Sequence, residues 1–94
     1  MKANIIKMKD FGKILTDRED GKKAFDVISY SLPPPYILDF SEVISLGSAF
    51  GDEVVGNLAA AQGNVIKVKN VINPIKNCLR RIEEDFKIKI IFLD

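Results

Sequence analysis

Serines and acidic residues are concentrated in the middle of the chain, in the segment ILDFSEVISLGSAFGDE. Asp39 ends an apolar stretch, Ser48 follows a short loop, and the pair Asp52 and Glu53 comes one helical turn later. A serine at a helix start can carry a phosphate, because free N–H groups and the helix dipole favour negative charge there. It can also serve as the N-cap, and capping alone explains a serine at this position. We therefore prefer the capping interpretation of Ser48 and keep regulatory phosphorylation as the alternative hypothesis.

These side chains do not combine into a catalytic arrangement. Asp52 and Glu53 are adjacent, so their carboxylates point about 100° apart on a helix and cannot converge on one bond. The chain contains no histidine, which removes the usual base for a serine or cysteine nucleophile and the commonest zinc ligand. Asp39 could bind a ligand at the end of its strand, but bonding to N–H groups of the following loop is the simpler role. We expect no enzymatic activity, no metal and no cofactor.

The composition is that of an ordinary globular domain. Of the 94 residues, 47% are hydrophobic and 29% are charged, and the net charge is +1. This length suits a single domain over residues 1–94, and the near-neutral charge provides no general attraction to nucleic acid or membrane. The lone Cys78 excludes an internal disulfide. No segment resembles a signal peptide or is long enough to span a bilayer, so we expect a cytoplasmic protein.

Strands and helices alternate along the chain and must position these residues. Apolar patterns predict strands at 4–11, 36–40, 64–70 and 87–94, and helices at 16–32, 48–63 and 73–86. Thr16 and Glu19 have capping-box spacing at the first helix start, whereas Gly21 weakens that helix. The order β-α-β-α-β-α-β predicts an α/β fold. We expect a mixed sheet of about four strands with the helices largely on one face.

The order and spacing of these residues resemble the STAS-like domain family, small bacterial proteins related to the STAS domain of anti-sigma factor antagonists. The resemblance covers nearly the whole chain, and the matching residues are Leu38, Asp39, Phe40, Ser41, Ser48, Phe50, Asp52 and Glu53, with Gly12, Leu15, Thr16, Arg18 and Gly21 earlier. In phosphoregulated STAS proteins the modified serine is the second of a pair, and Ala49 occupies that position here. Gly47 replaces the aspartate that precedes the pair. The usual phosphoacceptor is therefore missing.

The resemblance implies a non-catalytic regulatory domain that binds a protein, by analogy an anti-sigma-type or histidine-kinase-like ATPase. The expected contact surface is the loop and helix start at 45–53, namely Ser45, Gly47, Ser48, Ala49, Asp52 and Glu53. The alternative is a small-ligand sensor that binds a nucleotide or metabolite near Asp39 and Gly47, where the strands of open α/β sheets end. Neither interpretation includes a nucleic-acid or membrane partner.

Overall fold

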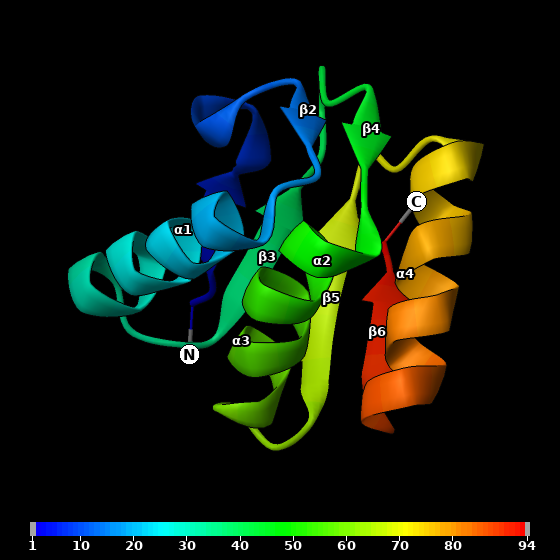
Figure 1. Cartoon of the computed structure of the whole chain (residues 1–94). Helices are drawn as coiled ribbons and strands as arrows, with labels where there is room; N and C mark the ends of the chain where they lie inside the picture. Colours follow the sequence, from blue (N-terminus) through cyan, green and yellow to red (C-terminus); the bar gives the residue numbers. More distant parts are fainter. Residues whose placement is uncertain (1, 94) are drawn as a thin grey trace.

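The computed structural model describes residues 2–93 and contains a four-stranded sheet covered by helices (Figure 1). In order across the sheet, the strands are β1 (Asn4–Lys7), β3 (Tyr36–Asp39), β5 (Val65–Lys69) and β6 (Lys89–Phe92). The predicted α/β fold and its four alternating strands are confirmed. Every strand pairing is parallel, where a mixed sheet was expected. Each connection between neighbouring strands contains a helix, which returns the chain to the same end of the sheet and permits parallel pairing at every step.

Three helical segments connect the strands. They are α1 (Arg18–Ser31), a continuous helix over residues 48–60, and α4 (Asn73–Phe86). The middle helix consists of α2 (Ser48–Gly51), the π-helical η2 (Asp52–Gly56) and α3 (Asn57–Ala60), and a 3-10 turn, η1 (Met8–Phe11), follows β1. Successive strands always step in one direction across the sheet, so right-handed crossovers place every connecting helix on the same face. Figure 1 shows the helices in front of the sheet.

The side chains of the sheet alternate between this helical layer and the opposite face. Most of those pointing to the helices are buried, namely Ile6, Tyr36, Leu38, Ile66, Val68 and Ile90. They pack with buried apolar side chains of the helices, among them Ile28, Phe50, Val54, Leu58, Ile75, Leu79 and Ile82. The core therefore lies on one side of the sheet only.

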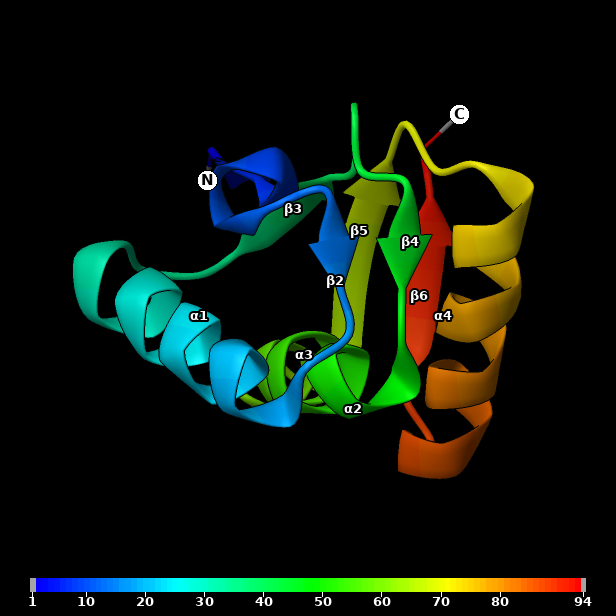
Figure 2. The same ribbon diagram turned by 45° about the horizontal axis from the view of Figure 1, so that its top comes forward.

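A second, smaller sheet was not expected from the sequence. It joins β2 (Ile14–Leu15) to β4 (Ser45–Leu46) in parallel, and β4 contacts α4. Figure 2 shows this pair of strands side by side, with β4 leading directly into α2. Each strand has only two residues, too few to produce a recognisable alternation. The small sheet fixes the segment that enters the middle helix.

The helix starts differ slightly from the expected ones. The N-cap of α1 is Asp17, whose carboxylate accepts a hydrogen bond from the Asp20 amide at 3.0 Å. The expected cap at Thr16 is wrong by one residue, because Asp17 offers the same spacing with a charged acceptor. Asn73, expected to cap α4, is instead its first residue, and Ile72 is the N-cap.

Candidate functional site

Ser48 is the first residue of the middle helix, and Gly47 is its N-cap. The Gly47 amide donates to the Leu15 carbonyl at 2.8 Å, and the Gly51 amide donates to the Gly47 carbonyl at 2.9 Å. The β2–β4 pairing thus assigns the cap position to Gly47, and the preferred interpretation of Ser48 as the N-cap is wrong. Ser48 is exposed, and no hydrogen bond found within residues 2–93 involves its hydroxyl. The backbone is held firmly while this side chain faces solvent.

The helix start also leaves backbone donors beside Ser48. The first helical hydrogen bond runs from the Gly51 amide, so the amides of residues 48–50 lie outside the helical ladder. Such donors, together with the helix dipole, favour an anionic group at this end. Ala49, in the position that the STAS resemblance assigns to a phosphoacceptor, is half-buried. Ser48 is therefore the more accessible member of the pair.

Asp52 and Glu53 are both half-buried and do not form a fully exposed acidic surface. Glu53 accepts a hydrogen bond from Arg18 of α1 at 2.7 Å, and its side chain is 20% exposed. Asp52 is half-buried, and its Oδ1 atom has no hydrogen-bond partner within residues 2–93. Burial raises the pKa of Asp52; Arg18 opposes the rise, while Asp85 and Glu53 add to it. The two carboxylates thus have different environments, one paired and one partly desolvated.

Asp39 connects two loops at the carboxyl end of β3. Its carboxylate accepts hydrogen bonds from the Ser41 amide and from the Asn70 side chain, each at 2.9 Å. The expectation that Asp39 bonds to an N–H group of the next loop is confirmed. Partial burial pushes the pKa of Asp39 up, but these two hydrogen bonds and the nearby lysines outweigh it and hold the pKa below its ordinary value.

A hollow of about 200 Å³ adjoins Asp39. Its lining residues are Lys7, Lys9, Asp39 and Ser41. Gly47 is not among them, because it packs against Thr16, where an added Cβ would lie 3.2 Å from the Thr16 Cα. The structure does not join Asp39 and Gly47, the two residues of the expected ligand site, in this hollow.

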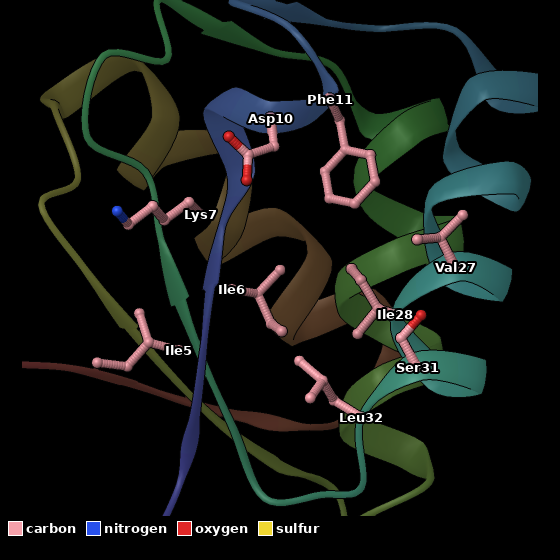
Figure 3. Close-up of a pocket in the computed structure, with 9 residues that line it drawn as sticks. All are labelled: Ile5, Ile6, Lys7, Asp10, Phe11, Val27, Ile28, Ser31 and Leu32. Carbon is pink, nitrogen blue, oxygen red and sulfur yellow. The ribbon is translucent and has the colours of Figure 1, made fainter.

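A second hollow, of about 180 Å³, lies between β1 and α1 (Figure 3). Its lining is mainly apolar and consists of Ile5, Ile6, Lys7, Asp10, Phe11, Val27, Ile28, Ser31 and Leu32. Val27 of α1 and Leu32, which follows α1, are exposed at this hollow. The sequence analysis missed this hollow, although Val27 lies beside the apolar stripe of α1 and could have signalled it.

Three further features concern metal binding, thiol reactivity and membrane-spanning helices. Within residues 2–93, no three histidine, cysteine, aspartate or glutamate side chains are grouped so as to hold a metal ion. Cys78 is half-buried on α4, and burial raises the pKa of its thiol, which disfavours the reactive thiolate. Among the described helices, none has the length and apolarity needed to cross a membrane.

The fold and site together define a small α/β domain in which a parallel sheet supports a firmly anchored loop and helix start. Comparison with protein families matches residues 34–76, just under half of the chain, to a family described as a STAS-like domain of unknown function. This match confirms the resemblance, and it includes Asp39, Ser48, Asp52 and Glu53. The earlier segment from Gly12 to Gly21 lies outside it. Comparisons with curated proteins and with solved structures gave no match.

Proposed function

We propose that this chain is a non-catalytic regulatory domain that binds a protein partner through the loop and helix start at 45–53. By analogy with anti-sigma factor antagonists, the partner is an anti-sigma-type or histidine-kinase-like ATPase in the cytoplasm. The support for this class of function is the family match, which spans the whole proposed surface. The proposal requires no catalytic group, metal or cofactor.

The observation that carries the choice of surface is the exposed side chain of Ser48 on an immobilised backbone. The Gly47 amide bonds to Leu15, and the helix over residues 48–60 packs against α1 and α4. A rigid contact surface loses little conformational entropy on binding, which favours specific recognition. Ser48, rather than the partly enclosed Asp52, is the side chain best placed to contact the partner directly.

Phosphorylation of Ser48 would regulate partner binding at the same surface. The hydroxyl is exposed and is not used as a cap, and the amides of residues 48–50 could stabilise an added phosphate. Asp52 and Glu53 lie one turn further along and oppose a second anion, although Arg18 offsets Glu53. Intact-mass measurement of the chain purified from its native host, in several growth phases, tests this modification directly.

Quantitative affinity purification from the native host tests the partner proposal. The wild-type chain should enrich an ATPase-like protein. Ser48→Glu should reduce recovery of this partner about tenfold. The new carboxylate would lose its hydration at the interface, which costs more than about 1 kcal/mol. Ser48→Ala should reduce recovery of the partner much less than Ser48→Glu does, because it removes a hydroxyl without adding a charge.

Ser31→Glu provides the matched control, because it makes the same substitution at an exposed serine at the far end of α1. It should leave recovery of the partner unchanged. Equal recovery with Ser48→Glu and wild type would contradict the assigned surface. Failure to enrich any ATPase-like protein would contradict the proposed class of partner.

A further inference from the structure

The face of the main sheet opposite the helices is open to solvent. Every connecting helix lies on one side, and the side chains directed to the other side are exposed or half-buried. Figure 3 shows this alternation in β1: Ile6 points toward α1, whereas Ile5 and Lys7 point away from it. We call the set of outward side chains of the four strands the open face.

The strand register arranges the open face in three rows. The members of each row lie side by side on neighbouring strands: Ile5, Ile37, Lys67 and Ile91; then Lys7, Asp39 and Lys69; then Val65 and Lys89. The first row crosses all four strands and is largely aliphatic. The other two rows flank it on either side and carry most of the charge.

The charge of the open face is strongly one-sided, although the chain as a whole is nearly neutral. Its four lysines are Lys7, Lys67, Lys69 and Lys89, and Asp39 is the acidic residue that the register places among them. Asp39 is already bonded to Ser41 and Asn70. The ion pairs found within residues 2–93 involve none of the four lysines. Among the outward residues of the four strands, Asp39 is the one acidic side chain and lies near Lys7 and Lys69, so the open face remains positive and partly aliphatic.

Parallel sheets are normally covered on both faces, because each strand is apolar on both sides. Here Ile5, Ile37, Val65 and Ile91 provide aliphatic surface on the side that no helix covers, and Ile5 is 50% exposed. A hollow of about 200 Å³ lies beside Asp39, and one of about 220 Å³ lies at the opposite end of the strands, where Val65 and Lys67 line it together with Tyr36, Gln62 and Ile66. An aliphatic row between hollows, flanked by cations, is suited to an amphipathic partner.

We propose that the open face binds an acidic amphipathic helix of a partner protein. The central row extends over three strand spacings, roughly 15 Å, which corresponds to about ten residues of helix. Apolar side chains at three- and four-residue steps would cover Ile5, Ile37 and Ile91, and acidic side chains beside them would pair with the lysines. Lys67, within the row, would pair with an acidic residue on the edge of the apolar stripe.

The side-chain chemistry favours a protein helix over the other polyanions. Single-stranded nucleic acids are held mainly by stacking of bases on aromatic rings. None of the outward side chains in the three rows is aromatic. An anionic membrane would attract the lysines, but Asp39 in their midst opposes a uniformly negative surface. The open face lies on the opposite side of the sheet from α2, so this inference stands or fails independently of the surface at 45–53.

Binding of a synthetic acidic amphipathic peptide tests the inference. The probe is a helix of about fifteen residues with leucines at positions i, i+3, i+4 and i+7 and glutamates elsewhere, followed by fluorescence anisotropy. Amide chemical-shift mapping should place it across β1, β3, β5 and β6, on residues such as Ile5, Ile37, Lys67 and Ile91. Lys67→Glu combined with Lys89→Glu should weaken binding about tenfold, because two attractive pairs become repulsive.

The matched control combines Lys22→Glu with Lys23→Glu, which makes the same change in net charge on the exposed side of α1. This control should bind the peptide with nearly wild-type affinity. The inference is overturned if the peptide does not bind, if the control weakens binding as much as the open-face variant, or if the shifts map to the start of α2. Tighter binding of single-stranded oligouridylate, or of phosphatidylglycerol vesicles, than of the peptide would overturn it in favour of those partners.

Discussion

At the scale of single residues, Asp39 stabilises the carboxyl edge of the sheet through two hydrogen bonds. Its carboxylate accepts from the Ser41 amide and from Asn70, which follows β5. Asp39 thus fastens the loop after one strand to the loop after its neighbour. The backbone of Asn70 adopts a left-handed conformation with φ of 59°, which asparagine tolerates better than most residues. The interaction therefore depends on the residue types at both ends.

The pKa of Asp39 makes this contribution depend on pH. Because its pKa in the folded protein lies below the ordinary value of 3.8, the charged form stabilises the fold above that pH. The stabilisation is lost as pH falls through the lower, folded-state pKa. We predict that Asp39→Ala lowers the free energy of unfolding by about 1–2 kcal/mol at neutral pH, from the loss of two hydrogen bonds to a charged group.

Urea unfolding of both proteins at pH 7 and at pH 2.5–3 checks this prediction. The difference between them should shrink at low pH, because a lowered folded-state pKa means that the unfolded chain takes up the proton more readily than the folded one. Asp26→Ala, at an exposed position on α1, is the control and should be nearly neutral at both pH values. A difference for Asp39→Ala that stays constant or grows on acidification would contradict the assigned role.

At the scale of elements, Gly21 sets the distance between α1 and the middle helix. A Cβ added to Gly21 would lie 3.0 Å from both the Phe50 carbonyl oxygen and the Glu53 Cβ. From sequence alone, Gly21 predicts only the conformational cost of a glycine within a helix. That cost is offset because glycine lets the two helices approach closely. Helix propensity does not predict this contact, because it contains no information about tertiary packing.

We predict that Gly21→Ala destabilises the domain, although alanine is the better helix former. Helix propensity alone would favour alanine by about 1 kcal/mol, whereas overpacking against backbone atoms costs about 1–3 kcal/mol. The expected net loss is about 1 kcal/mol in urea unfolding. Comparing Lys22→Gly with Lys22→Ala, at the next and exposed position, measures propensity alone. If Gly21→Ala stabilises the domain as much as alanine does relative to glycine at position 22, the close contact between α1 and the middle helix imposes no constraint.

The π-helical segment Asp52–Gly56 allows a similarly close approach between the middle helix and α4, on the side opposite α1. Gly51 and Gly56 both face α4, where added Cβ atoms would meet the side chains of Ile82 and Phe86. Residues five apart do not share a face in a regular α-helix, but the wider π turn brings them nearer to alignment. The spacing of Phe50, Val54 and Leu58 predicts the helix. It does not predict the π turn, because the apolar stripe looks regular.

At the scale of the whole molecule, the alternation of strands and helices was sufficient to predict the α/β fold from sequence. The alternation is compatible with a parallel or a mixed sheet, so it did not decide that every pairing is parallel, and the small sheet of β2 and β4 was not predicted. The small sheet matters most for the site, because it makes Gly47 the cap and leaves Ser48 exposed. Residue types predict that a helix starts near Ser48, whereas the position of the cap depends on a strand pairing between residues about thirty apart in the sequence.

The two edges of the main sheet differ in how they are protected. The edge strand β1 has four residues and ends in a 3-10 turn, so it offers few backbone groups for pairing. At the other edge, the Lys89 amide donates to Asn64 beside β5, so the Ile90 amide points outward by alternation. That amide donates to Glu83 of α4 at 2.7 Å. A helix side chain thus occupies the pairing position on β6.

We predict that Glu83→Ala promotes self-association through β6, because it frees the Ile90 amide for pairing with another chain. It should also lower the free energy of unfolding by about 1–2 kcal/mol, since it removes the partner of Ile90 and the acceptor of Arg80. Sedimentation velocity over a range of concentrations measures the association. Glu84→Ala, at the next and exposed position of α4, is the matched control. If both variants associate to the same extent, the cause is the lost negative charge. If Glu83→Ala does not associate, other groups protect this edge, such as Lys76 and Arg80 over the Phe92 ring.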